Sequence, residues 1–332
     1  HLRSSREALN NTTLEALGSE PLEPICWQAA SNEPQPKQQK ALTTLLHSAA
    51  ENSWRSRASD VDKARLTDCS TWGSGIVFRV IPNEAAFTIP DLAARLLLRL
   101  RLGLPVVGLA RWCDRCTAPL DQLGNHSHAC PGNPGIRHNR IRDLLHRLLS
   151  AAGFNAHKEQ EEPLLRHRPD IRVDAGLAPV LTYLEVHVSH PTAPSANHVA
   201  NALTPEAAAE NAWEDKLRQD YAPLPERPHF RLLPALFTTY GSWHPGTRRF
   251  LQECARRVVE AAGPQPNAAG MRQALFNRWA SSLAVAIHLE NAAMLQRCVA
   301  LSGRDISDRP WSEGAPPLWD LPSVPCLCPD LA

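Results

Sequence analysis

One segment, residues 113–135, constrains the fold of this chain more than any other. It is rich in Cys, His, Gly, Asn and Pro and has too few apolar side chains to form a core of its own. Cys113 and Cys116 form a Cys-x2-Cys pair, and His126 and Cys130 form a His-x3-Cys pair after nine intervening residues. Three thiolates and one imidazole at this spacing favour Zn²⁺ in a tetrahedral site. The sequence therefore predicts a zinc knuckle over this segment.

The fourth ligand of this predicted site has a competitor. His128 also lies near Cys130, but His126 is favoured because its longer spacing to Cys130 gives the chain more room to turn. Free thiols in a loop are the alternative interpretation. The chain has nine cysteines, an odd number, and no visible secretory signal, so a disulfide framework is not expected. Because the protein fills all four metal positions, the expected role of the zinc is structural.

Composition limits the class of protein. The chain has 332 residues, 43% of them hydrophobic, which suits a buried core and about two domains. Its formal charge of +1 excludes a uniformly basic nucleic-acid-binding protein but allows a local basic patch. The most apolar stretch, residues 92–109, carries three arginines, so no membrane span or membrane partner is expected. The missing initiator Met suggests a piece of a longer protein.

Helical and strand patterns alternate after the knuckle. Residues 137–152 carry apolar side chains at helical spacing along one stripe, and residues 180–189 alternate as a strand does. Further elements are expected as strands at 170–173 and 230–240, the latter an edge strand containing Pro234, and as helices at 204–221, with Thr204 as cap, and 247–262. The order helix, strand, strand, helix, strand, helix predicts one mixed α/β domain over residues 136–262.

The flanking regions are expected to be mainly helical. A strand-like run at 72–80 precedes a helix from about residue 90 to 102, within an otherwise helical or irregular region at 1–112. A further helix at 271–302 and a Pro-rich tail form the C-terminal region, 263–332.

Two carboxylates fall on neighbouring predicted strands. Asp170 heads the first strand, and Glu185 lies midway along the second, on the same face as His187. Carboxylates that converge in this way suit a hard cation such as Mg²⁺, which can activate water and stabilise charge on a scissile phosphate. Two solvated carboxylates without any partnership are the alternative. The cations available to balance a phosphate are Arg137, Arg168 and Lys216.

These motifs occur together in a recognisable order. The Cys-Cys-His-Cys set is followed by Arg137-His138-Asn139, then Arg168-Pro169-Asp170, then Glu185-Val186-His187-Val188. This order resembles the C-terminal region of site-specific non-LTR retrotransposon proteins. In that family a zinc knuckle and a restriction-like endonuclease of the PD-(D/E)xK kind follow the reverse transcriptase. The resemblance covers about residues 90–250 and extends to Lys216 and Tyr221.

The resemblance implies a role for each matching residue. Asp170 and Glu185 would bind the catalytic Mg²⁺, and Lys216 would position water or phosphate. An acidic residue before the first strand would complete the site, and Glu162 is favoured for it over Glu161 and Glu159. His187 stands where the family pattern has its lysine, so either His187 or Lys216 is the essential cation. The nucleic-acid contacts would come from Arg137, His138, Arg140 and Arg168.

The activity implied by the resemblance is Mg²⁺-dependent nicking of double-stranded target DNA in the nucleus. The nick would leave a 3′ hydroxyl that primes reverse transcription of element RNA, which an upstream polymerase region would bind. The restriction-like endonuclease would occupy residues 136–262. A catalytically degenerate nucleic-acid-binding module and a purely structural zinc domain are the alternatives.

Overall fold

The computed structural model describes residues 35–107, 111–113, 115–131, 135–163, 165, 167–178, 180–193, 196–221 and 229–299. The chain divides into two compact units, His1–Lys63 and Ala64–Ala332. Helix α3 (Gln35–Arg57) belongs to the first unit, and α4 (Asp60–Ser70) begins there and ends in the second. The predicted Pro-rich tail lies outside the described residues. No helix among those described is long and apolar enough to cross a membrane.

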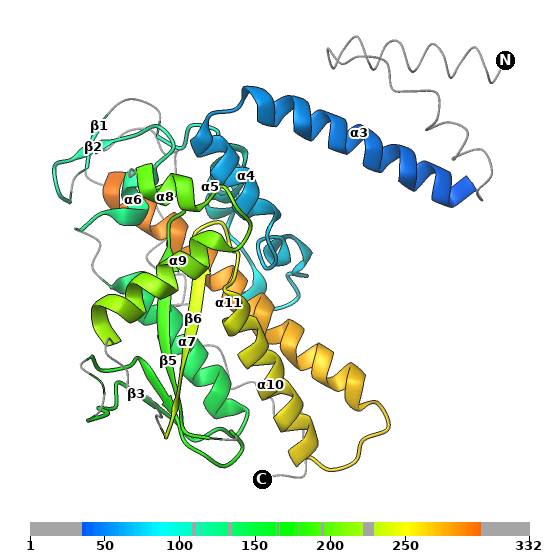
Figure 1. Cartoon of the computed structure of the whole chain (residues 1–332), viewed down its shortest axis with the longest axis vertical. Coiled ribbons are helices and arrows are strands. Elements are labelled where there is room, and N and C mark those ends of the chain that lie inside the picture. The colour runs from blue at the N-terminus through cyan, green and yellow to red at the C-terminus, as the bar shows by residue number, and fades with distance from the viewer. Residues whose placement is uncertain are drawn as a thin grey trace. The chain divides into compact units, whose positions relative to one another are not determined.

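A four-stranded mixed sheet forms the centre of the second unit (Figure 1). The strands are β3 (Ala156–Lys158), β4 (Ile171–Val173), β5 (Thr182–Ser189) and β6 (Arg231–Thr238), in that spatial order. Strands β3, β4 and β5 pair antiparallel, whereas β5 and β6 pair parallel. The predicted mixed α/β class is confirmed. Strand β6 lies at the edge of the sheet, as predicted. Pro234 has no N–H to donate, and an edge strand tolerates it because no further strand pairs on its outer side.

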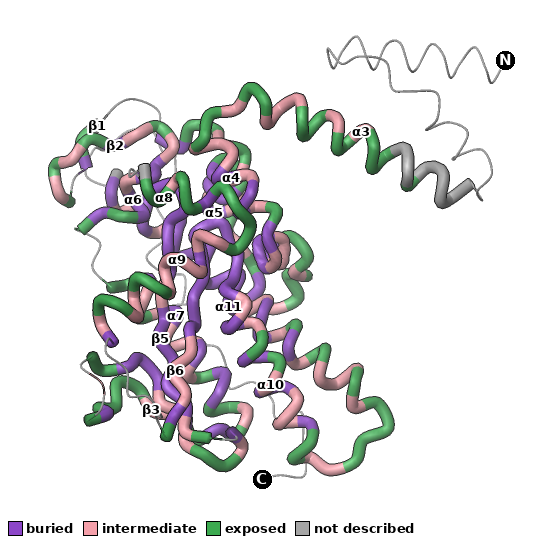
Figure 2. The backbone as a smooth tube through the Cα atoms, in the orientation of Figure 1, coloured by how far each residue is buried: buried purple, intermediate pink, exposed green. Residues whose placement is uncertain are grey.

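Helices α7 (Ile136–Ala151) and α10 (Pro245–Ala261) pack on the apolar face of this sheet, and α11 (Ala268–Val299) packs against both of them. All three lie close to the predicted helices. The alternate β5 residues Leu184, Val186 and Val188 face them and are buried. Burial of each such side chain contributes about 1.5–3 kcal/mol. Figure 2 shows the buried residues concentrated on the sheet, α7 and α11. The apolar alternation of β5 thus determines which face of the sheet remains for polar side chains.

The opposite face of β5 lies against α9 (Ala207–Lys216) and the π-helical turn η3 (Leu217–Tyr221). Short α8 (Ala196–Asn201) precedes α9. The predicted start of this helix, with Thr204 as cap, is wrong. Glu206 adopts a left-handed backbone conformation with φ of 67°, which does not fit the interior of a right-handed helix. Helix α9 therefore begins at Ala207, directly after Glu206.

The segment before the knuckle contains helices and no strand in its described residues up to 107. Helix α5 (Asp91–Leu102) agrees with the prediction and ends at Gly103, whose φ of 66° suits glycine. The strand-like run at 72–80 is instead a 3₁₀ turn, η1 (Ile76–Arg79), and a second such turn, η2 (Ala85–Phe87), follows. Val77 of η1 packs against Leu97 of α5 and Ala284 of α11, so the apolar residues are buried without strand pairing.

Helix α11 joins the knuckle to the sheet. It packs against α7, α10, α5 and α6, and its apolar residues enter both the sheet core and the cluster around Cys113 and Cys130. An α-helix rises about 1.5 Å per residue. The 32 residues of α11 are therefore long enough to reach from the core beside the sheet to the cluster around Cys113 and Cys130. The predicted knuckle, the sheet and α11 therefore belong to one compact unit.

Candidate functional site

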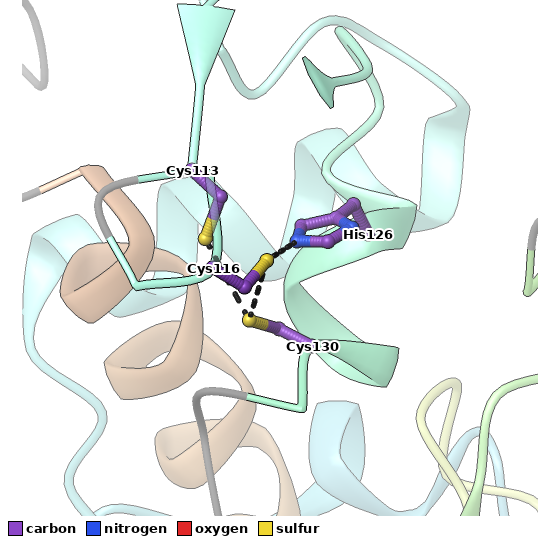
Figure 3. A group of neighbouring side chains, drawn as sticks. All are labelled: Cys113, Cys116, His126 and Cys130. Carbon is purple, nitrogen blue, oxygen red and sulfur yellow. Dashed lines mark hydrogen bonds between the residues drawn. The ribbon is translucent and has the colours of Figure 1, made fainter. Parts of the chain in front are cut away.

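The predicted zinc ligands come together in the structure. Strands β1 (Arg111–Trp112) and β2 (Pro119–Leu120) form a hairpin that carries Cys113 and Cys116, and α6 (Asn125–Ala129) carries His126 and ends beside Cys130. Sγ of Cys116 lies 3.1 Å from Nε2 of His126, and Sγ of Cys130 lies 3.6 Å from the other two sulfurs (Figure 3). All four candidate ligand atoms lie within 4.8 Å of one another. This group can bind a metal ion such as zinc.

The Cys113 thiol of this cluster is suited to binding a cation. Burial raises the pKa of Cys113, but N–H groups of Arg115 and Cys116 and hydrogen bonds to His126 and Cys130 lower it to about 6. A thiolate is the form that binds zinc. The competing His128 is buried away from the cluster, with its ring centroid 4.8 Å from that of His190. The donor set therefore contains His126, as the spacing argument predicts.

The chain between the ligands fixes α6 to the sheet. The Asp121 carboxylate accepts hydrogen bonds from the N–H groups of Asn125 and His126, at 3.1 and 2.9 Å, and so caps α6. Oδ1 of Asn125 accepts from the Thr192 hydroxyl at 2.7 Å and lies 3.0 Å from Nε2 of His190. His190 and Thr192 directly follow β5. The knuckle is thus hydrogen-bonded to the end of the strand that carries Glu185.

The two predicted carboxylates lie side by side on the sheet. Ile171 of β4 pairs with Leu184 of β5, and the same antiparallel register places Asp170 opposite Glu185, on one face. Both residues are buried, Glu185 almost completely. Oδ2 of Asp170 accepts the N–H of Val186 at 2.8 Å, and Oδ1 lies 2.8 Å from Nε2 of His138 on α7.

Glu185 is contacted from α9 and η3. Its Oε1 lies 2.9 Å from Nζ of Lys216, and its Oε2 accepts a hydrogen bond from the hydroxyl of Tyr221. Nζ of Lys216 also lies 2.5 Å from Oδ2 of Asp220. His167 approaches the same carboxylate, with Nε2 4.0 Å from Oε1. The structure therefore brings Lys216 to Glu185 across the long connection between β5 and α9.

The electrostatics of this site favour a cation. Burial, and next the negative charge of Asp170, raise the pKa of Glu185 against the opposing effects of Tyr221 and Lys216. Burial alone would lower the pKa of Lys216, but its bonds to Asp220 and Glu185 raise it overall. Burial and the nearby charge of Lys216 lower the pKa of His187 to about 4. His187 is therefore neutral at physiological pH, while Lys216 carries a permanent charge.

The remaining predicted residues have other surroundings. Glu162 is buried on the Glu185 face but accepts a hydrogen bond from the Tyr183 hydroxyl at 2.8 Å, and it is not in the cluster around Glu185. Arg140 pairs with Glu290 at 2.5 Å, and the exposed Arg168 lies 3.3 Å from Glu159.

Arg137 occupies an interior position. It is buried, and its guanidinium donates to Oδ1 of Asn291 and to the carbonyls of Val188 and His128. The DNA contact predicted for Arg137 does not fit this position, because all of these partners belong to the protein interior. Arg137 instead joins α7 to β5, α11 and the knuckle.

Sequence reasoning did not select Asp220 or His167 for the site. Asp220 had a detectable signal, because a residue four positions after a helical lysine shares its face. His167 precedes the Arg168-Pro169-Asp170 motif without any periodicity that could place it.

No protein-family model, curated protein or solved structure matches this chain.

Proposed function

We propose that this chain is a Mg²⁺-dependent DNA endonuclease with a restriction-like core, and that its knuckle binds a structural Zn²⁺. One observation carries the proposal: two buried carboxylates, Asp170 and Glu185, stand opposite each other in the β4–β5 register, and Glu185 is paired with the charged Lys216. A carboxylate pair with an adjacent lysine suits hydrolysis of a phosphodiester, in which negative charge develops on phosphate oxygens.

Asp170 and Glu185 would hold the Mg²⁺. Oδ2 of Asp170 and Oε2 of Glu185 are engaged by buried donors, the Val186 N–H and the Tyr221 hydroxyl. Oδ1 of Asp170 contacts His138, and Oε1 of Glu185 contacts Lys216. Both partner side chains are partly exposed, so a metal ion could replace them at these two oxygens. When bound, the cation would supply an activated water and charge stabilisation at the phosphate.

The side chains of this site divide the remaining work. Lys216 would donate hydrogen bonds to a phosphate oxygen, because its charge persists in the site. His138, released from Asp170, would face the same phosphate from α7. The exposed Arg168, next to Asp170 in sequence, would contact the DNA backbone and hold its register.

We further infer from the motif order that the nick serves target-primed reverse transcription in the nucleus, with element RNA bound by an upstream polymerase region. The product end required for that role is a 3′ hydroxyl. A non-cleaving DNA-binding module is the second candidate, and the neutral His187 at the position of the family's lysine favours it.

A plasmid-nicking assay tests the proposal. Supercoiled DNA is incubated with the chain and Mg²⁺ or EDTA, and the nick is tested for extension by a DNA polymerase. We expect Mg²⁺-dependent, extendable nicks that Asp170→Ala and Glu185→Ala abolish. Glu161 is an exposed carboxylate in the connection between β3 and β4, which leads to Asp170. Glu161→Ala is the matched control and should cleave normally. DNA binding without nicking in Mg²⁺ or Mn²⁺ would establish the second candidate instead.

A further inference from the structure

The Lys216 ammonium lies between two carboxylates that belong to different parts of the site. Oε1 of Glu185, on the sheet, is 2.9 Å away, and Oδ2 of Asp220, on the following turn, is 2.5 Å away. Glu185 has a role in the proposed cation site, whereas Asp220 has none. Asp220 is only partly buried, so its carboxylate does not need this ammonium to be compatible with the fold.

The local backbone explains how this arrangement arises. Helix α9 ends at Lys216 and continues as the π-helical turn η3. An α-helix aligns residues three or four apart, whereas a π turn also aligns residues five apart. Lys216, Asp220 and Tyr221 can therefore all face Glu185 at once, as their contacts show.

A cation bound at Glu185 would change the partners of Lys216. Oε2 of Glu185 is held by Tyr221, which is buried, so a metal ion would compete with the ammonium for Oε1. Displaced from Oε1, the lysine would keep one carboxylate partner, Asp220. Without that partner its long flexible side chain would leave the site for solvent, at a gain in rotamer entropy.

We propose that Asp220 is a positioning residue, which keeps the Lys216 ammonium at the reaction centre while a divalent cation occupies Asp170 and Glu185. This inference rests on the proposed function. Direct ligation of the metal by Asp220 is the competing role, because candidate ligand atoms of His167, Glu185 and Asp220 lie within 4.8 Å of one another. The Lys216 ammonium, 2.5 Å from Oδ2 of Asp220, argues for positioning, because that oxygen already has a charged partner that a cation at Glu185 does not displace.

A double-mutant cycle separates the two roles. Asp220→Asn, Lys216→Ala and the double variant are compared with wild type for single-turnover nicking at saturating Mg²⁺ and for Mn²⁺ affinity by calorimetry. We expect nicking to fall about 10-fold in Asp220→Asn and about 100-fold or more in Lys216→Ala, in keeping with loss of one charged transition-state contact. The double variant should equal Lys216→Ala, because Asp220 acts through Lys216.

The metal measurement is the decisive readout. In the Lys216→Ala background, Asp220→Asn should leave the Mn²⁺ affinity within about 3-fold, since a positioning residue without its lysine has no function. A further loss of 10-fold or more would show that Asp220 ligates the metal and would overturn the inference. Asp220→Glu should restore part of the nicking, and it guards against a variant that fails to fold.

Two comparisons complete the test. Asp215→Asn, on α9 and paired with Arg218, makes the same charge change away from Lys216 and should nick normally. If it slows nicking as much as Asp220→Asn, the effect is one of net charge and the inference is wrong. A wild-type chain that neither binds Mn²⁺ nor nicks DNA would refute the proposed function as well, whereas a nicking wild type with an additive cycle would refute the inference alone.

Discussion

Arg137 and Arg168 were both predicted to contact nucleic acid, but the structure gives them different surroundings. Arg137 is buried and bonded to groups from β5, α11 and the knuckle, whereas Arg168 is exposed beside a surface carboxylate. The sequence offered no way to separate them, because both stand in motifs that the family resemblance associates with nucleic acid. Burial assigns Arg137 a role in stability, whereas the exposed Arg168 is placed for the proposed DNA contact.

Substitution of these arginines should therefore have opposite consequences. Arg137→Ala leaves buried acceptors unpaired and should lower the free energy of unfolding by about 1–3 kcal/mol. Arg168→Ala should change the free energy of unfolding by less than about 0.5 kcal/mol but weaken DNA binding and reduce its salt dependence. Urea denaturation and DNA titration at two salt concentrations check both. Equal destabilisation by the two substitutions would contradict this assignment.

Which side chain supplies the positive charge in the proposed nuclease is also a question at the residue scale. Because His187 is neutral near pH 7 and Lys216 is charged, Lys216→Ala should remove nicking while DNA affinity stays within a few-fold of wild type. His187→Ala should retain most of the activity. Gel-shift and nicking assays on the same preparations measure both quantities. An inactive His187→Ala beside an active Lys216→Ala would give the role to the histidine.

At the level of elements, the sequence predicted periodic segments well and irregular ones poorly. The apolar stripe of α7 and the alternation of β5 located both elements within one or two residues. Strand β3 was missed because its three residues carry one small apolar side chain, Ala156, whereas the equally short β4 carries Ile171 and Val173. The start of α9 was wrong because the left-handed backbone of Glu206 overrides the local cap signal at Thr204. The carboxylate pair was predictable because strand register alone decides it. Asp220 was not selected, although its spacing of four residues from Lys216 was readable, because the long connection after β5 hides which helix residues reach Glu185.

The knuckle is the element whose stability we expect to depend most on a metal ion, because its four candidate ligands lie together. Cys116→Ser removes one of the three thiolates of the proposed zinc site. We expect the variant to lose its zinc, because a structural site needs all four of its protein ligands. Loss of the metal should loosen α6 and, through Asn125, its contact with the end of β5. Zinc analysis and limited proteolysis measure the two effects. Cys69→Ser, a half-buried thiol outside the cluster, is the control and should retain zinc. Full zinc content in Cys116→Ser would contradict the assigned ligand set.

Across the whole second unit, buried histidines make stability depend on pH. Burial lowers the pKa of both His190 and His288 to about 3, with the charges of Arg137 and Arg101, respectively, acting in the same direction. An unfolded chain binds these protons at a pKa near 6.5. The stability that the neutral rings contribute is therefore complete above about pH 6.5 and is lost as the pH falls toward 3. Asp68 acts oppositely, because burial raises its pKa to about 6 and its protonation favours the folded state below that pH.

His288 allows this balance to be tested with a single substitution. Its ring is buried on α11 against Gly241, and its nitrogens make no hydrogen bond among the described residues. His288→Leu should differ from wild type by a constant amount above pH 7. Below about pH 6.5 the variant should gain relative stability by about 1.4 kcal/mol per pH unit, because it has no ring to protonate on unfolding. Urea denaturation from pH 7.5 to 5.0 measures the difference, and Met294→Leu, an apolar exchange on the same helix, should show none of this pH dependence. A His288→Leu difference that stays constant down to pH 5.0 would mean that the ring is already protonated, or readily hydrated, in the folded chain.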